Sequence, residues 1–481
     1  MDLIYNDLKS IQEVRCLIER AKKAQKIYCE LGQEKIDYIA KKVAEAGERN
    51  AETLAKLAVE ETGFGKYKDK IIKNKFASRV VYESIKNLKT IGIIKEDMNK
   101  KVVEIGTPVG VIAGLIPSTN PTSTAIYKSL ISLKAGNAII FSPHPNAKNC
   151  IIETVNILSK AAVEAGAPEG IIGCMTIPTM EGTDELMKND DVALILATGG
   201  SAMVKAAYSS GTPAIGVGPG NGPAFIEKSA DIKKAVKRII DSKTFDNGVI
   251  CASEQSIVVE ECIREEVIEE LKAQKCYFLN TEEGEKVSKF ILRVNGTMNP
   301  QIVGKAAKDI ANMAGISIPS ETKVLIYEQE KVGKKYPFSR EKLAPLLAFY
   351  TEKNWEEACE KCIEILNNEG IGHTLIIHSN NEEVIKAFAL KKPVSRILVN
   401  TPGALGGIGG TTNLLPALTL GCGAVGGSAT SDNVSPLNLI NIRRLAYGAR
   451  ELEDLKPKES PIVNDELISE ITKLVLEKLN S

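Results

Sequence analysis

The residue with the clearest chemical potential is Cys251, in residues 247–253 (NGVICAS). The preceding Asp246-Asn247-Gly248 favours a loop, and loops on a rigid scaffold commonly present nucleophiles. Residues 218–223 (GPGNGP) form a glycine-rich partner segment without a carboxylate. A thiol in a site with no nearby carboxylate base forms a thioester that it cannot easily hydrolyse, so the acyl group must pass to another acceptor. The alternative is a buried cysteine that only packs as a small apolar group.

Asn120 could stabilise the charge that such a nucleophile creates. It lies in residues 117–122 (PSTNPT), just past an apolar run typical of a strand. When a thiolate adds to a carbonyl, the oxygen becomes negative, and a positioned side-chain amide can donate a hydrogen bond to it. The alternative is an Asn-Pro turn without a chemical role.

Thr198-Gly199-Gly200-Ser201 follows directly on another apolar strand and precedes a helical pattern. Glycines at such a junction let backbone N–H groups approach an anion, and the helix N-terminus favours its negative charge. A simple strand-to-helix connection would carry the same residues. Together with Cys251 and Asn120, this turn indicates an anion-binding element of the same cleft.

Alternating strands and helices must position these residues. Residues 1 to about 90 are typical of successive amphipathic helices, with Gly63 and Gly65 as the clearest break. Apolar strands and helical patterns then alternate, which predicts two doubly wound α/β domains with a cleft between them and a boundary near residue 225. Ligands gather at the carboxyl ends of parallel strands. The expected strands are 109–117, 137–141, 171–177, 192–197, 255–259, 323–327, 375–378 and 395–399.

Composition excludes several classes of protein. A chain of 481 residues is too long for one core, and its 43% hydrophobic and 25% charged residues are ordinary for a globular protein. Lysine plus arginine and aspartate plus glutamate both number 61, so no net field attracts nucleic acid or an anionic membrane. The sequence shows neither a signal peptide nor an apolar run long enough to span a membrane.

The ten cysteines have no framework spacing, which indicates reduced thiols and a cytoplasmic protein. The close pair Cys359 and Cys362 lies in a helical pattern without a second pair. We therefore expect ordinary helix positions rather than a redox or zinc motif.

Taken in order, five segments resemble the CoA-acylating aldehyde dehydrogenases, a branch of the aldehyde dehydrogenase superfamily. That branch includes acetaldehyde, propionaldehyde, butyraldehyde and succinate semialdehyde dehydrogenases, some of them from bacterial microcompartments. Similar motifs continue through residues 372–374, 431–433 and 438–442, so the resemblance covers roughly residues 100 to 450. The five segments are residues 107–112 (TPVGVI), 117–121 (PSTNP), 141–145 (FSPHP), 218–223 (GPGNGP) and the Cys251 loop.

The resemblance implies a subunit with three parts. Residues 1–225 would hold the N-terminal helices and a Rossmann-like NAD-binding domain, and residues 226–415 a catalytic domain carrying Cys251. Residues 416–455 would return to the cofactor domain and form a small oligomerisation element. The pattern of residues 456–481 separately predicts a linker and a C-terminal helix. A homodimer or homotetramer is expected.

The resemblance also implies the reaction. Cys251 would add to a short-chain aldehyde, with Asn120 and the Cys251 backbone N–H as the oxyanion hole. Loss of hydride to NAD would leave a thioester, which coenzyme A would take up as acyl-CoA, and the sequence of steps is reversible. The alternatives are a hydrolytic aldehyde dehydrogenase and a non-catalytic binding or scaffold protein.

Val217 argues against hydrolysis. In hydrolysing relatives a glutamate activates water against the thioester, and matching Pro223 to the proline of that motif puts Val217 at the glutamate position. A positioned general base contributes typically about 10² to 10⁴ in rate, so water is a poor acceptor here. The alternative is that another carboxylate, such as Glu254, supplies the base.

Cofactor contacts follow from the same resemblance. Glu341, in residues 341–346 (EKLAPL), resembles the superfamily's ribose-binding glutamate, although a solvated helix charge is the alternative. Ser142, Pro143 and His144 replace the lysine that hydrolysing relatives place near the adenosine ribose. Thr198, Gly199, Gly200, Ser201 and Gly218 complete the expected cofactor-binding set. We expect NAD rather than NADP, with coenzyme A as co-substrate and no metal.

His144 and His373, two of three histidines, are expected to be structural or to contact coenzyme A, because loss of hydride needs neither. Residues 403–412 and 421–427 are glycine-rich and are expected to shape the aldehyde end of the cleft. Relatives often carry an aromatic residue where Val425 stands, so the acyl group is left open.

The C-terminus carries a separate signal. Residues 455–461 are typical of a linker, Asn464 or Asp465 could cap a helix, and an apolar stripe then follows at helical spacing. A tethered amphipathic helix resembles the peptides that send enzymes into bacterial microcompartments. The alternative is packing on its own or a neighbouring subunit. The stripe consists of Leu467, Ile468, Ile471, Leu474, Val475 and Leu479.

Overall fold

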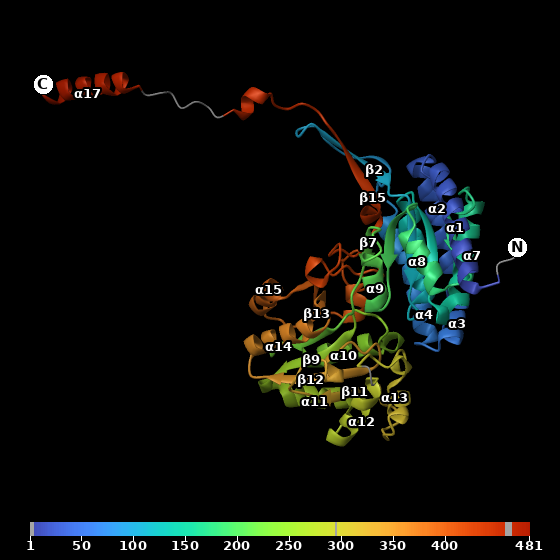
Figure 1. Ribbon diagram of the computed structural model, residues 1–481. Coiled ribbons are helices and arrows are strands. Elements are labelled where there is room, and N and C mark those ends of the chain that lie inside the picture. Colours follow the sequence, from blue (N-terminus) through green and yellow to red (C-terminus); the bar gives the residue numbers. More distant parts are fainter. Residues whose placement is uncertain (1–3, 294–295, 457–463) are drawn as a thin grey trace. The chain divides into compact units, whose positions relative to one another are not determined.

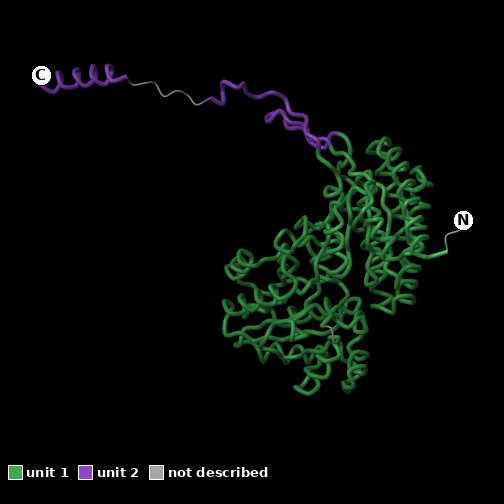
Figure 2. The backbone as a smooth tube through the Cα atoms, viewed as in Figure 1, with its two compact units in different colours: residues 1–92, 106–442 green, residues 93–105, 443–481 purple. Residues whose placement is uncertain are grey.

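The computed structural model describes residues 4–293, 296–456 and 464–481. These divide into two compact units, one built from residues 1–92 and 106–442 and the other from residues 93–105 and 443–481 (Figure 2). The larger unit contains both α/β sheets and every candidate site residue. Within the described part of the chain, each helix is too short or too polar to cross a bilayer.

The larger unit begins with the expected helices. Gly63 adopts the left-handed φ of +66° that closes one of them, which explains the break seen in the sequence. Their apolar residues recur at helical spacing, as in the buried Ile36, Ile39, Ala40 and Val43. The helices are α1 (Asn6–Tyr28), α2 (Gly32–Arg49), α3 (Ala51–Thr62), α4 (Tyr67–Lys75) and, after a π-helical turn at Phe76–Val80, α5 (Val81–Ile85).

The first sheet is five-stranded and parallel, in the order β5-β4-β3-β6-β7. The chain runs from β3 outward to β5, then returns to the other side of β3 for β6 and β7. The winding direction therefore changes between β3 and β6, the position where such sheets bind ligands. The strands are β3 (Val111–Ile116), β4 (Ala138–Pro143), β5 (Ile172–Cys174), β6 (Val192–Ala197) and β7 (Ala214–Gly216), alternating with α6 (Pro121–Lys134), α7 (Lys148–Glu164), α8 (Met180–Lys188) and α9 (Ser201–Tyr208).

The second sheet is seven-stranded and parallel, in the order β10-β11-β12-β9-β8-β13-β14. Figure 1 shows it in green to orange, apart from the first sheet and its blue and cyan helices. Its strands are β8 (Gly222–Ile226), β9 (Glu254–Glu260), β10 (Cys276–Phe278), β11 (Val324–Glu328), β12 (Leu346–Glu352), β13 (Gly372–His378) and β14 (Val394–Val399).

Helices cover both faces of this second sheet, because successive strand residues point to opposite sides. On one face Ala224, Ile257 and Ile376 pack with α10 (Ile232–Thr244) and α11 (Arg264–Ala273). On the other, Phe225, Val258 and Leu375 pack with a second set of helices. That set is α12 (Thr281–Ile291), α13 (Ala307–Met313), α14 (Trp355–Asn368) and α15 (Glu382–Lys391).

The smaller unit contains strand β1 (Gly92–Asp97) from its second residue on, and parts of β2 (Val102–Pro108) and β15 (Ile440–Ala446), which form a three-stranded sheet in the order β1-β2-β15. It also contains α17 (Asp465–Leu479). Asn464 caps this helix, since its side chain accepts from the Leu467 N–H at 3.1 Å. The expected linker falls mostly on residues 457–463, outside the described residues.

The expected fold of two doubly wound α/β domains is confirmed. Each expected strand is present within a few residues of its predicted bounds, but seven strands were not predicted. The expected domain boundary near residue 225 lies inside β8, while β7, the last strand of the first sheet, ends at Gly216. The strands not predicted are β1, β2, β7, β8, β10, β12 and β15.

Candidate active site

A cavity of about 240 Å³ is lined by loops of both α/β sheets of the larger unit. The first sheet contributes segments that follow the carboxyl ends of its strands, as expected. The second sheet contributes the opposite ends, because Cys251 precedes β9 and Gly218 precedes β8. The lining segments include residues 117–120 after β3, 198–200 after β6, 217–219 after β7 and 249–251 before β9.

Cys251 is partly exposed to this cavity and is a free thiol. Burial, and after it the nearby Glu341 carboxylate, raise the pKa of the thiol to about 12, while the charge of Arg396 opposes the shift. The turn before it has three consecutive left-handed residues, Asp246, Asn247 and Gly248, with φ of 48°, 54° and 75°. The Cys251 loop is thus held in a conformation that most residue types avoid.

Asn120 lines the same cavity and begins helix α6. Its Nδ2 donates to the Val249 carbonyl at 3.2 Å, two residues before Cys251. Its Oδ1 accepts from the Lys73 ammonium on helix α4. The predicted oxyanion donor and the predicted nucleophile are therefore brought together.

Lys73 is the charged lining residue that sequence reasoning missed. It is 2% exposed, and its ammonium also pairs with the buried Asp246 carboxylate. Burial lowers the pKa of Lys73 to about 8, while Asp246 opposes the shift. A lysine-rich helix is typical of a solvated face, so no sequence signal marks this residue.

The cavity does contain a carboxylate, which corrects the expectation of a site with none nearby. Glu341 Oε1 accepts from the Gly220 N–H at 2.7 Å, and burial raises the pKa of Glu341 to about 8. Among the described lining residues it is the sole carboxylate. Val217 also lines the cavity and is 6% exposed.

Glu254 does not line the cavity. It is fully buried, and its Oε1 accepts from the Gly403 N–H at 2.7 Å. Burial raises the pKa of Glu254 to about 7. Its position in the packed interior does not suit a base that must activate water against Cys251.

A second cavity, of about 270 Å³, adjoins the first through shared residues Pro117, His144 and 198–200. Most of its lining is apolar, and the Ser142 and Thr183 hydroxyls within it lie 2.8 Å apart. Pro143 also lines it, whereas Ser201 is exposed as the first residue of α9 and does not.

This second cavity suits a dinucleotide. The Thr198 Oγ1 is buried without a protein partner. The N-terminus of α9 has no side-chain cap, and a Cβ on Gly200 would have nothing within 4 Å. Uncapped N–H groups and open backbone favour a phosphate, while the apolar lining favours an adenine ring.

The two histidines differ in position. His144 lines both cavities, and its Nδ1 accepts from the Asn146 N–H at 3.1 Å. Burial lowers the pKa of His144. His373 is fully buried and lines neither cavity, and its Nδ1 lies 2.9 Å from Thr374 Oγ1. Burial also lowers the pKa of His373, to about 3, so the ring is neutral.

The glycine-rich segments contribute to an apolar part of the cavity wall. Ile408, inside residues 403–412, and Leu418 and Leu420, just before residues 421–427, line the cavity that contains Cys251. Val425 is 53% exposed and does not line it.

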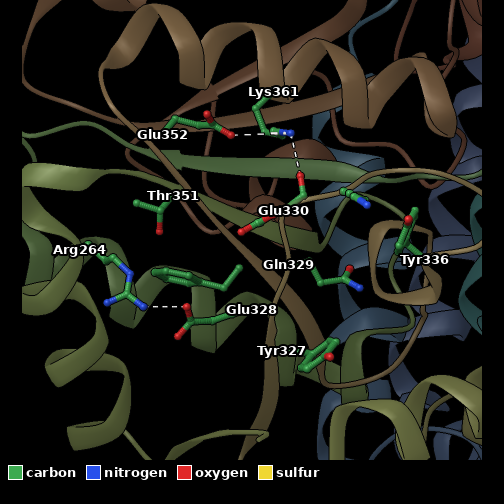
Figure 3. A pocket seen from close by; sticks show the side chains of 11 residues that line it. Arg264, Tyr327, Glu328, Gln329, Glu330, Tyr336, Thr351, Glu352 and Lys361 are labelled. Atoms are coloured by element: carbon green, nitrogen blue, oxygen red, sulfur yellow. Dashed lines mark hydrogen bonds and ion pairs between the residues drawn. The ribbon is translucent and has the colours of Figure 1, made fainter. Parts of the chain in front are cut away.

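A larger groove, of about 800 Å³, lies elsewhere and shares no residue with these cavities (Figure 3). It lies at the carboxyl ends of β11 and β12, which end at Glu328 and Glu352. Its labelled cations are already paired, Arg264 with Glu328 at 2.7 Å and Lys361 with Glu352 at 3.8 Å. Size alone does not make it the reactive site.

The described residues contain no group of three or more histidine, cysteine, aspartate or glutamate side chains placed to hold a metal ion. Cys359 and Cys362 are both buried, free thiols on α14, as expected for ordinary helix positions.

Comparison with known proteins connects this site to a family. The aldehyde dehydrogenase family model matches residues 7–291. The chain is 46% identical over 474 residues to the bifunctional aldehyde-alcohol dehydrogenase AdhE of Escherichia coli, covering 96% of this chain and 53% of that protein. It is 38% identical over 438 residues to a succinate-semialdehyde dehydrogenase (acetylating) of Clostridium kluyveri, covering 91% of this chain and 96% of that protein. The chain thus spans about half the length of the bifunctional relatives.

Solved structures of aldehyde dehydrogenases are also similar to this chain. A probable aldehyde dehydrogenase from Listeria monocytogenes has a TM-score of 0.93 at 66% identity, covering 94% of this chain and 100% of the other. An acetylating aldehyde dehydrogenase from Geobacillus thermoglucosidasius has a TM-score of 0.92 at 55% identity, covering 95% and 100%.

Two structures of lower sequence identity have names that state a substrate, a location or a bound ligand. A propionaldehyde dehydrogenase from a Clostridium phytofermentans bacterial microcompartment has a TM-score of 0.81 at 30% identity, covering 90% of this chain and 97% of the other. One from Rhodopseudomonas palustris, with bound CoA and an acylated cysteine, has a TM-score of 0.81 at 26% identity and the same coverage. The resemblance seen in the sequence is confirmed, and the chain belongs to the aldehyde dehydrogenase family.

Proposed function

We propose that this protein is a CoA-acylating aldehyde dehydrogenase that converts a short-chain aldehyde, coenzyme A and NAD reversibly to acyl-CoA and NADH. The observation that carries the proposal is the cavity that contains the Cys251 thiol and the Asn120 amide, with the apolar Val217 in its wall. Acetylating enzymes and an acylated cysteine among the relatives support it.

The chain's own residues perform the covalent steps. Cys251 releases its thiol proton to water and adds through sulfur to the aldehyde carbon, and the carbonyl oxygen becomes an oxyanion. Asn120 Nδ2 and the Cys251 N–H donate to that oxygen. Collapse of the adduct restores the C=O bond and expels hydride, leaving a thioester on Cys251. A bound nicotinamide ring supplies the hydride acceptor.

Release of the acyl group needs a second thiol. The thiolate of coenzyme A adds to the Cys251 thioester, the same donors hold the new oxyanion, and Cys251 leaves as thiolate. Val217 cannot take a proton from water, which disfavours hydrolysis. The exchange of one thioester for another makes the step reversible.

The second cavity would bind the cofactor. Gly199, Gly200 and the N-terminus of α9, which begins at Ser201, would hold its phosphates, with Gly218 nearby in the first cavity and Ser142, Pro143 and His144 around the adenosine. Glu341 would accept from a ribose hydroxyl. We assign NAD rather than NADP as the cofactor. We also assign residues 1–225 to cofactor binding and residues 226–415 to catalysis. Residues 416–455 would lead the chain back to the cofactor domain and form the oligomerisation element.

NADH formation from short aldehydes, with and without coenzyme A, tests the activity. We expect strict dependence on coenzyme A, and loss of the signal in Cys251→Ala. Free acid made without coenzyme A would instead show a hydrolytic enzyme, and absence of any NADH signal would show a binding protein. Acetaldehyde, propionaldehyde, butyraldehyde and succinate semialdehyde, compared by kcat/KM, identify the acyl group.

We further propose that α17 attaches the enzyme to a bacterial microcompartment shell. No residue of this helix is buried, and its large apolar side chains are about half exposed or more. A microcompartment enzyme among the structural relatives supports this assignment. Deleting residues 457–481 should leave activity and oligomer size unchanged and abolish co-sedimentation with shells. Collapse of the expected homodimer or homotetramer would show instead that α17 packs between subunits.

A further inference from the structure

We propose that Lys73 is a positioning residue for catalysis: its ammonium, held by Asp246, fixes the Asn120 amide so that an N–H group faces the substrate oxygen. This inference rests on the proposed function, in which Asn120 stabilises the oxyanion. Lys73 lies on α4, among the N-terminal helices. It stands outside residues 100 to 450, which carry the sequence resemblance.

Three contacts define the arrangement. The Lys73 ammonium donates to Asn120 Oδ1 and to Asp246 Oδ2. Asn120 Nδ2 donates to the Val249 carbonyl at 3.2 Å. Asp246 is fully buried and stands at the start of the left-handed turn before Cys251. The lysine therefore links the oxyanion donor to the loop that carries the nucleophile.

The contacts allow only one orientation of the amide. An ammonium has donors and no acceptor, whereas a backbone carbonyl has only acceptors. A flipped Asn120 would point its NH₂ group at the ammonium and its oxygen at the Val249 carbonyl. Both partly buried contacts would then become repulsive.

The correct orientation leaves a donor available. The Asn120 NH₂ group carries two N–H bonds, of which one serves the Val249 carbonyl. The other has only a long contact, at 3.4 Å, with Thr119 Oγ1. This second N–H can exchange that long bond for one to an oxyanion formed beside Cys251, and the charge on Lys73 polarises the amide and strengthens the new bond.

Asp246 keeps Lys73 in place. Its carboxylate also accepts from the Lys66 backbone N–H at 2.6 Å and from the Lys70 ammonium at 3.1 Å. Lys70 contacts the Thr119 carbonyl at 3.0 Å but has no bond to the Asn120 side chain. The two lysines thus share the carboxylate, and Lys73 alone of the two reaches the amide.

A double-mutant cycle on the full-length enzyme tests the inference. We expect Lys73→Met to lower kcat/KM for the aldehyde about 10- to 100-fold and Asn120→Ala to lower it about 100- to 1000-fold. If Lys73 acts through Asn120, Lys73→Met should lower the rate of the Asn120→Ala enzyme by less than about threefold. Lys68→Met, at an exposed position of the same helix, is the surface control and should stay within about twofold of wild type.

Two further measurements separate positioning from structural damage. Alkylation of Cys251 by iodoacetamide creates no oxyanion, so its rate should change less than about threefold in Lys73→Met. In Lys73→Met the Asp246 carboxylate keeps Lys70 as its partner, so the variant should fold, and its circular-dichroism spectrum should match that of wild type.

Multiplicative losses in the cycle, or a Cys251 alkylation rate that falls as much as kcat/KM, would overturn the inference. These outcomes differ from failure of the proposed function. In that case the wild-type enzyme itself would show no NADH signal that depends on coenzyme A, and the cycle could not be measured as acylation.

Discussion

Replacing Val217 by glutamate should convert part of the thioester exchange into hydrolysis. Val217 is 6% exposed and lines the same cavity as Cys251. A carboxylate at this position could take a proton from a water molecule that attacks the Cys251 thioester. The product would then be a free acid, and NADH would form without coenzyme A.

The expected increase in the rate of hydrolysis can be worked out from Glu341, the other carboxylate in the cavity. Burial raises the pKa of Glu341 to about 8, and a second carboxylate beside it would be at least as hard to ionise. It would be about half ionised at pH 8 and about one tenth ionised at pH 7. A fully ionised general base contributes about 10² to 10⁴ in rate, so we expect acceleration of about 10- to 1000-fold at pH 7.

The assay is turnover without coenzyme A. NADH and free acid are measured from pH 6 to 9, together with the intact mass of the acylated protein. In Val217→Glu the hydrolysis rate should rise with pH through about 8, as the carboxylate loses its proton, and should approach a plateau only toward pH 9. Val217→Gln has nearly the same shape but no base, and it should accumulate acylated Cys251. Equal hydrolysis by both variants, or no hydrolysis by acylated Val217→Glu at pH 9, would refute the reasoning.

Three further predictions concern the same cavity. Cys251→Ser should bind NAD, measured by fluorescence, but should form no NADH, since a serine hydroxyl lacks the nucleophilicity of a thiolate. Glu341→Gln removes a negative charge that raises the pKa of Cys251, so the pH profile of alkylation by iodoacetamide should move to lower pH, and the KM for NAD should rise. Gly65→Ala should lower the free energy of unfolding by about 1 to 3 kcal/mol more than Gly32→Ala, measured by urea denaturation. Both glycines have φ near +77°, but only at Gly65 would the new Cβ collide with the Asp246 carboxylate.

Strands in the first sheet could be predicted because burial on both faces requires a continuous apolar run. Strand β3 (VIAGLI) is such a run, and every residue of it is buried. Strand β8 is buried throughout and β12 over its first five residues, but β8 begins with Gly222 and Pro223, and β12 follows Pro345. Their sequences therefore indicate binding motifs rather than strands. Strand β1 is mostly exposed and shows no clear alternation, so its sequence (GIIKED) carries no strand signal.

Residues of the site could be predicted where they follow a strand or a glycine turn, since local sequence marks those junctions. Cys251 and Asn120 line one cavity as a result, and Val217 and Glu341, which the family resemblance predicts, line it too. The assignment of Glu341 to a ribose did not reveal that its carboxylate also acts on the Cys251 thiol. That interaction depends on burial, and burial is not visible in a sequence.

Lys73 shows why part of a site escapes sequence reasoning. An amphipathic pattern predicts that lysines of a helix such as α4 (YKDKIIKNK) lie in solvent. The structure buries Lys70 and Lys73 because Asp246, far along the chain, provides their counter-charge. The same carboxylate stands in the left-handed turn that presents Cys251. The ion pairs that offset the cost of burying these lysines therefore also join helix α4 to the Cys251 loop. A buried charge pair of this kind adds little net stability, since desolvation offsets its attraction. Its value to this enzyme would therefore lie in orientation: it fixes which atom of Asn120 meets the oxygen of the substrate.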